Sequence, residues 1–192
     1  KNKNIFSAIG IHPSEINEKF DKEKYKELAK SKKVVAIGEI GLDNKFKDER
    51  QKQVFVEQLN LAEELNLPVI IHCRMAYADV LEILKDKKLR GVIHCFTGNW
   101  EEAQKYLELG FYLGINGIIF KFDINKTIKN CPLDKILTET DCPYLTPPMA
   151  GAERNEPIFV KHVIQKIAEI KKISFQEVAS ATTKNAQKLF GI

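Results

Sequence analysis

The sequence predicts an α/β protein with a TIM-type (β/α)8 barrel, of which about six strands are visible in these 192 residues. Two observations lead to this class. Short apolar runs alternate with segments of helical periodicity, which is typical of a parallel sheet covered by helices. Four of the runs lead into a histidine or a carboxylate. Only a closed barrel brings the ends of four separate strands around a single mouth.

Six apolar runs are expected to form the strands, because each is short and lies between segments of helical pattern. They cover Ile5 to Ile11, Val34 to Ile40, Pro68 to His72, Gly91 to Cys95, Phe111 to Ile115 and Lys135 to Thr140. A barrel of this kind has eight strands in about 250 residues. The count therefore predicts one domain, 1–192, that lacks the first two βα units. We expect that the chain is a fragment of a longer protein. Alternatively, the gap in the barrel is closed by a second copy of the chain or by a rearranged terminus.

Helical patterns fill the gaps between the strands and follow the last one. They cover Asp48 to Asn66, Val80 to Leu84, Ala103 to Leu107 and Val160 to Ile170. Asn99 with Glu102 is a plausible helix start, and Ser174 with Glu177 forms a capping box for a final helix. The longest stretch without periodicity, Tyr144 to Glu156, follows the last strand. A long loop at the C-terminal end of a parallel strand more often has a function than not.

Composition is that of an ordinary globular protein, with 44% hydrophobic and 29% charged residues. No apolar stretch approaches the roughly 18 residues of a membrane span, and no signal-peptide pattern opens the chain. The opening KNKN, without an initiator Met, reads like the middle of a protein. A net charge of +4, spread over many lysines, would help an anionic substrate approach without identifying one.

The cysteines are expected to be reduced, which predicts a cytoplasmic protein. No CxxC motif occurs among the 4 cysteines. Cys73 and Cys95 directly follow His72 and His94. Neighbouring residues of a strand face opposite ways, so cysteines next to inward-facing histidines would lie beneath the helices as small apolar residues. This alternation also argues against a cysteine nucleophile.

Four polar residues at the apolar runs form a candidate ligand set for a divalent metal: Glu39, His72, His94 and Asp141. Imidazole nitrogens and carboxylate oxygens suit Mg, Mn or Zn, and a carboxylate can bridge two metals. Taken alone, Glu39 fits a surface salt bridge and each histidine fits a core residue bonded to a carbonyl. The repeated I-H-C context, together with Asp141, favours the metal-dependent hydrolase.

Three further residues lie near this set in the sequence. Arg74 comes two residues after His72, faces the same way, and is a candidate for bidentate binding of a phosphate. The alternative for Arg74 is a structural ion pair with Glu39 or Asp43. His12 ends the first visible strand and is expected to line the mouth as a substrate-binding residue. Asp43 is interpreted as a helix cap.

The sequence resembles the TatD family of metal-dependent deoxyribonucleases, a branch of the amidohydrolase-like barrels. The matching segments run in family order over nearly the whole chain. They are GIHP (10–13), VVAIGEIGLD (34–43), the Q-x-x-x-F-x-x-Q-L stretch (51–59), LPVIIHCR (67–74), GVIHCFTG (91–98), ILTETDCPYL (136–145), RNEP (154–157) and NAQKLFGI (185–192).

The resemblance implies a barrel that holds divalent metal and hydrolyses phosphodiester bonds of DNA, often from the 3′ end. Carried onto this chain, the ligands would be Glu39, His72, His94 and Asp141. Glu39 would be the bridge, and Asp141 would also orient or deprotonate the attacking water. Many family members carry an H-x-H pair at the end of the first strand, and this chain has no counterpart. We therefore expect one or two ions.

The predicted function is a metal-dependent deoxyribonuclease with DNA as partner and no membrane association. An enzyme alternative keeps the same site but hydrolyses another ester or amide, such as an aminoacyl-tRNA ester. An alternative of another class is an inactive, metal-free barrel scaffold. We expect a monomer for a complete barrel and self-association for an open one, because exposed strand edges pair readily with other chains.

Overall fold

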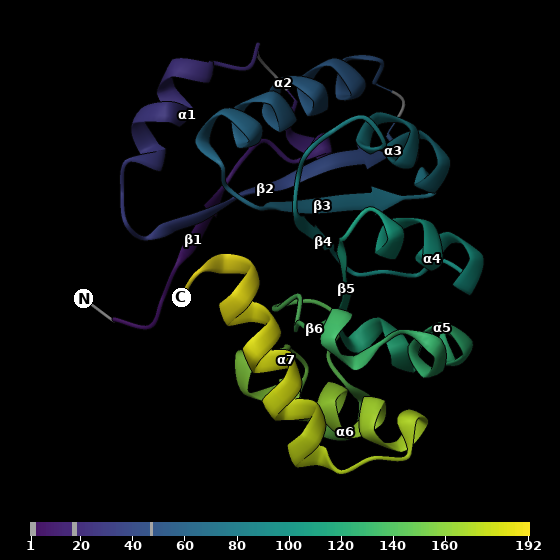
Figure 1. Cartoon of the computed structure of the whole chain (residues 1–192). Helices are drawn as coiled ribbons and strands as arrows, with labels where there is room; N and C mark the ends of the chain where they lie inside the picture. Colours follow the sequence, from purple (N-terminus) through teal and green to yellow (C-terminus); the bar gives the residue numbers. More distant parts are fainter. Residues whose placement is uncertain (1–2, 17–18, 47) are drawn as a thin grey trace. The chain divides into compact units, whose positions relative to one another are not determined.

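A computed structural model describes residues 3–16, 19–46 and 48–192 (Figure 1). The chain divides into two compact units. The first unit comprises Lys1–Ile93 with Leu189–Ile192, and the second comprises His94–Lys188. Apolar side chains are buried in both, for example Phe55 in the first and Leu113 in the second. Each unit is therefore described with its own strands, helices and polar cluster.

The first unit contains four parallel strands that are neighbours in sequence order. They are β1 (Ser7–Ile9), β2 (Val34–Asp43), β3 (Val69–Arg74) and β4 (Gly91–Ile93). The register of β2 and β3 sets Gly41 beside His72 and Asp43 beside Arg74. An added Cβ on Gly41, whose φ is +150°, would lie 1.9 Å from the carbonyl oxygen of His72. Only glycine permits this close approach next to a candidate site residue.

Three helices accompany these strands: α1 (Lys22–Ala29), α2 (Arg50–Leu65) and α3 (Tyr77–Leu84). Helix α2 buries Phe55, Leu59 and Ala62 along one face, as its periodicity predicts. Helix α1 has no buried residue. Its Lys22 and Lys26 instead pair with Glu64 of α2 at 2.7 and 2.6 Å, and the two helices lie side by side (Figure 1). The short 3-10 helix η1 (Pro13–Glu15) follows β1.

The second unit pairs two parallel strands, β5 (Tyr112–Ile115) and β6 (Ile136–Thr138), with Leu113 beside Ile136. Its elements otherwise are helical. They are α4 (Trp100–Glu108), η2 (Gly117–Phe120), α5 (Asn125–Asn130), η3 (Leu133–Lys135), η4 (Pro148–Ala150), η5 (Pro157–Phe159), α6 (Val160–Lys171) and α7 (Phe175–Phe190), whose residues through Lys188 belong to this unit.

Within the described residues, all six predicted strands are present, with different ends. Both predicted helix caps are confirmed. Asn99 Oδ1 accepts from the Glu102 N–H and Glu102 Oε2 from the Asn99 N–H, each at 2.8 Å. Ser174 and Glu177 cap each other in the same way, at 3.1 and 2.8 Å. None of the described helices is long and apolar enough to cross a membrane.

Candidate active site

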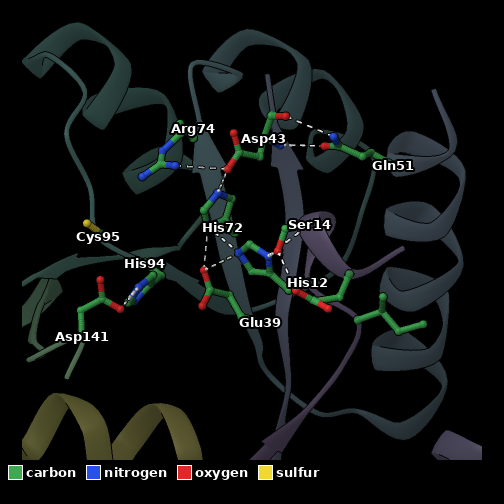
Figure 2. Close-up of polar contacts among 12 residues, drawn as sticks. His12, Ser14, Glu39, Asp43, Gln51, His72, Arg74, His94, Cys95 and Asp141 are labelled. Carbon is green, nitrogen blue, oxygen red and sulfur yellow. Dashed lines mark hydrogen bonds and ion pairs between the residues drawn. The ribbon is translucent and has the colours of Figure 1, made fainter. Parts of the chain in front are cut away.

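His72 of β3 lies between two carboxylates of β2. Its Nδ1 is 2.8 Å from Glu39 Oε1, and its Nε2 is 2.9 Å from Asp43 Oδ2 (Figure 2). Parallel pairing of β2 with β3 brings these residues together across two adjacent strands. Both ring nitrogens therefore face acidic oxygens, an arrangement typical of histidines that are oriented for metal binding.

The predicted strand Val34 to Ile40, with Glu39 near its end, is too short, because β2 continues to Asp43. The register of β2 with β3 shifts between Gly38 and Ile40, so Glu39 occupies a β-bulge. A bulge inserts an extra residue and re-aims its side chain, and bulges are frequent beside active sites. The irregularity thus explains how a residue inside a strand presents its carboxylate to His72.

The interpretation of Asp43 as a helix cap is also wrong. Helix α2 begins at Arg50, and its N-cap residue is Glu49. The Asp43 side chain is 1% exposed, and its Oδ1 accepts a hydrogen bond from the Lys45 N–H at 2.9 Å. A buried carboxylate needs such partners to remain charged. Asp43 therefore belongs to the polar cluster around His72.

Arg74 forms the ion pair with Asp43 that was the alternative to phosphate binding. Its guanidinium nitrogen lies 3.6 Å from Asp43 Oδ2, while its side chain is 53% exposed. A guanidinium carries five N–H donors in a fixed fork, and one long contact to Asp43 does not use all of them. The ion pair and phosphate binding by Arg74 are therefore compatible.

His12 joins the same cluster from the segment that follows β1. Its Nε2 lies 3.1 Å from His72 Nδ1 and 3.7 Å from Glu39 Oε1, and the three side chains point toward one another in Figure 2. Its Nδ1 lies 2.7 Å from the Ser14 hydroxyl. Burial and then the neighbouring His72 lower the pKa of His12 below the usual imidazole value. A neutral imidazole is the form that binds metal.

The His12–Glu39–His72 group fits a divalent metal. Each residue offers one ligand atom, and these atoms lie within 4.8 Å of one another. Two imidazoles and a carboxylate form a donor set that suits Zn or Mn, and a carboxylate-rich surrounding also suits Mg. His12 was expected from sequence to bind substrate, and its position makes it a further candidate ligand beside Glu39 and His72.

The second unit holds a histidine in the same kind of surrounding. His94 Nδ1 lies 3.0 Å from Glu139 Oε2. Its Nε2 lies 3.4 Å from Asp141 Oδ1, and Figure 2 shows these two side chains facing each other. Strand β4 ends at Ile93 and β6 at Thr138, so both acidic residues and the histidine lie just beyond strand ends. The predicted proximity of His94 and Asp141 is confirmed within this unit.

Glu139 was not predicted as a site residue, although it stands in the same ILTETD segment as Asp141. Its carboxylate accepts from the Cys95 N–H at 3.1 Å. A Cβ added to Gly114 would come within 2.0 Å of Glu139 Oε1, so glycine in β5 makes room for this side chain. The available signal was the spacing of two acids two residues apart, which share a face in extended chain.

Cys95 is half-buried and lies beyond the end of its strand, so the alternation of strand side chains does not apply to it. The strand has ended at Ile93, and Cys95 has a φ of +49°. Its half-buried Sγ lies 3.5 Å from Asn116 Oδ1. Cys73, inside β3, is buried as expected, and all four cysteines are free thiols.

The Tyr144–Glu156 loop is tied to the backbone around Asp141 by a buried amide. Asn155 Nδ2 donates to the carbonyl oxygens of Thr140 at 2.7 Å and Tyr144 at 2.6 Å. Asp141 itself has a φ of +59°, a conformation that needs support in a residue other than glycine. A cavity of about 280 Å³ opens beside it, lined by Cys142, Pro143, Arg154, Asn155, Glu156 and Pro157.

Parallel strands that carry histidines paired with carboxylates at and beyond their ends define a metal-dependent hydrolase of the α/β class. Comparison with known proteins agrees. The family described as TatD related DNase matches residues 1–191. The chain therefore belongs to the TatD family, and it is a metal-dependent hydrolase that acts on ester bonds.

Curated relatives match almost the whole chain. It is 44% identical to the uncharacterized metal-dependent hydrolase YabD of Bacillus subtilis (strain 168), over 98% of this chain and 78% of the relative. It is 37% identical to the 3′-5′ ssDNA/RNA exonuclease TatD of Escherichia coli (strain K12), over 97% of this chain and 78% of the relative.

Solved structures establish the fold class. The TatD homologue YJJV from Escherichia coli k12 superposes with a TM-score of 0.90 at 30% identity, covering 100% of this chain and 78% of its own. A TatD family hydrolase from Entamoeba histolytica gives 0.85 at 26% identity, over 96% and 74%. The predicted class, the TatD-type TIM barrel, is confirmed by these likenesses.

Proposed function

We propose that this hydrolase is a divalent-metal-dependent deoxyribonuclease that removes nucleotides from the 3′ end of DNA. The His12–Glu39–His72 cluster carries the proposal, because its donor atoms fit a metal. The exposed Arg74 follows His72 by two residues and pairs with Asp43, which contacts His72. The likeness to a relative named as a 3′-5′ ssDNA/RNA exonuclease supports the substrate class.

We assign metal binding to Glu39, His72, His94 and Asp141, and add His12. Glu39 is the proposed bridge if two ions bind, because a carboxylate has two oxygens and Glu39 Oε1 already faces two imidazoles. A bound Mg, Mn or Zn would polarise the phosphoryl oxygen and lower the pKa of a water molecule.

The chain's own side chains bind the substrate and move protons. Arg74, with its exposed side chain, holds a non-bridging phosphate oxygen by charge-assisted hydrogen bonds. Asp141, whose side chain is 34% exposed, accepts the proton from the attacking water. The water oxygen forms a bond to phosphorus, the bond from phosphorus to the 3′ oxygen of the preceding nucleotide breaks, and that oxygen takes up a proton from solvent water. His94, held between Glu139 and Asp141, keeps Asp141 in place.

The decisive test is nucleotide release from a single-stranded oligonucleotide labelled at its 5′ end. The purified chain is assayed with Mg²⁺ or Mn²⁺ added singly and with EDTA. We expect a ladder that shortens from the 3′ end, abolished by EDTA. An enzyme that binds metal but leaves DNA intact, and cleaves an aminoacyl-tRNA ester instead, would contradict the substrate. A chain that binds no metal would contradict the proposal as a whole.

A matched pair of variants links the activity to the cluster. Glu39→Gln removes one negative charge beside His72 while keeping the side-chain shape, and should abolish the ladder. Glu23→Gln makes the same chemical change on the exposed face of α1 and should leave it intact. Equal activity in both variants would remove Glu39 from the reaction.

A further inference from the structure

Two buried glutamines of α2 bind the main chain of residues next to the first-unit cluster. Gln58 Oε1 accepts from the Ile11 N–H at 2.6 Å, and its Nε2 donates to the Ile11 carbonyl at 3.2 Å. Gln51 binds the main chain of Asp43 in the same way. Its Oε1 accepts from the Asp43 N–H at 2.8 Å, and its Nε2 donates to the Asp43 carbonyl at 3.1 Å. Each amide thus satisfies both backbone groups of one residue.

These contacts take the place of pairing between β1 and β2, which ends with Ile9 beside Ile37, whereas Asp43 is still paired with Arg74 on the β3 side. Strand β1 ends at Ile9, two residues before Ile11. Asp43 is the last residue of β2, and the next ladder bond toward β3 is made by the Asn44 N–H to the Arg74 carbonyl. Buried backbone groups left without partners are costly. A side-chain amide carries both N–H donors and an oxygen acceptor, so it supplies what a neighbouring strand would supply.

The spacing of the two glutamines lets helix α2 bind the main chain at both strand ends. They are seven residues apart, which is about two helical turns, so they project from the same face of α2. Gln51 is 5% and Gln58 1% exposed. Gln51 Nε2 also donates to the Phe46 carbonyl at 2.7 Å, which secures the chain that leaves β2.

Both clamped residues lead directly to side chains of the cluster. Ile11 precedes His12, whose Nε2 faces His72 and Glu39. The carboxylate of Asp43 holds His72 through Nε2 at 2.9 Å. A shift of either backbone segment would therefore move one of the two imidazoles relative to Glu39.

We propose that Gln51 and Gln58 are positioning residues that set His12 and His72 in the geometry required to bind the metal. Neither amide touches the proposed ligand atoms, and each acts through the backbone that it holds. The inference rests on the metal site of the proposed function, but not on the identity of the substrate.

A purely structural role is the alternative, and the chain offers a matched control for it. Asn185 is another buried amide, and its Nδ2 donates to the carbonyls of Leu133 at 2.9 Å and Ile136 at 2.8 Å in the second unit. Losing it should destabilise the protein in a similar way. It binds no backbone next to His12 or Asp43. Gln53, exposed on α2, controls for mutation of the helix itself.

The experiment titrates the purified, metal-free chain with Co²⁺, which accepts imidazole and carboxylate ligands and absorbs visible light according to its coordination geometry. The variants are Gln51→Met, Gln58→Met, Asn185→Leu and Gln53→Ala. Thermal unfolding without metal measures stability separately. Where a methionine variant fails to fold, Gln51→Glu or Gln58→Glu keeps the side-chain oxygen and volume and takes its place.

We expect the two α2 variants to bind Co²⁺ about 10–100-fold more weakly, as for other residues that orient metal ligands, and with an altered visible spectrum. Asn185→Leu should lower the unfolding temperature yet keep the wild-type affinity and spectrum, and Gln53→Ala should change neither. Wild-type affinity and spectrum in the folded Gln51 and Gln58 variants would overturn the inference. So would an equal loss of affinity in Asn185→Leu.

The failure of the proposed function gives a different result. A wild-type chain that binds Co²⁺ but hydrolyses no DNA contradicts the proposed deoxyribonuclease. The positioning role of Gln51 and Gln58 is then still decided by the Co²⁺ affinities of their variants. A wild-type chain that binds no divalent metal overturns both, because there is then no metal geometry for the glutamines to set.

Discussion

His72 in the first unit and His94 in the second have the same surroundings, built in different ways. Each imidazole has a carboxylate facing each ring nitrogen. Around His72 the carboxylates come from positions 39 and 43 of one strand, with a β-bulge at the first. Around His94 they come from positions 139 and 141, just after a strand has ended.

The two surroundings differ most in how accessible the second carboxylate is. Asp43 is almost fully buried and its backbone is clamped, whereas the Asp141 side chain is one-third exposed. A buried, hydrogen-bonded carboxylate is suited to orienting a histidine, and an accessible one is suited to meeting water. We therefore propose that Asp43 orients His72 and that Asp141 transfers the proton.

The largest expected effect tests what the two surroundings share. His72→Ala and His94→Ala should each lower DNA hydrolysis by about 1,000-fold or more, because each removes a proposed ligand and the imidazole that two carboxylates face. His162→Ala, on α6, is the control and should retain activity. Turnover by single-turnover assay decides, and a histidine whose loss leaves turnover normal does not belong to the site.

The next effect tests the difference between the carboxylates. Asp141→Asn should lower kcat by about 100-fold or more even at saturating metal, as expected for loss of a group that accepts a proton, with little change in stability. Asp43→Asn should chiefly weaken metal binding, because the amide holds His72 less firmly. Steady-state kinetics and metal titration on both variants separate the two roles. The reverse pattern would exchange the assignments.

Two glycines extend the comparison to the backbone. Gly41→Ala would bring a methyl group 1.9 Å from the His72 carbonyl, which is backbone and cannot rotate away. We expect a loss of about 3 kcal/mol or more in the free energy of unfolding. In Gly114→Ala the new methyl group would meet the end of the flexible Glu139 side chain. The free energy of unfolding should therefore fall by only about 1 kcal/mol. Activity should fall as well, because Glu139 is displaced from His94. Urea denaturation with an activity assay checks both, and equal destabilisation would contradict the contrast.

The smallest effect concerns Arg74. Arg74→Ala should raise KM for DNA by about 10-fold, the value of one charge-assisted contact, and leave metal affinity unchanged. Arg154→Ala removes an exposed arginine of the second unit. It changes the net charge by the same amount and serves as the control. A parallel loss of metal affinity in Arg74→Ala would show that its ion pair with Asp43 orients the ligands.

Sequence reasoning located the fold and most of the cluster, and it failed where local rules are broken. Apolar periodicity found β2 and α2, because both are strongly buried. It gave no range for α1, which buries nothing and so has no apolar stripe to detect. The position of Glu39 depends on a bulge, and the role of Asp43 depends on contacts across strands. Neither feature can be predicted from the spacing of residues along the chain.

The seven-residue interval between Gln51 and Gln58 makes part of α2 intolerant of changes in length. Inserting one residue between them would rotate the second amide by about 100° around the helix axis, and its partner Ile11 would lose both hydrogen bonds. Inserting seven would restore the angle but move the amide about 10 Å along the axis. Substitutions on the outer face of this interval should therefore be accepted in directed evolution, whereas insertions and deletions should be eliminated.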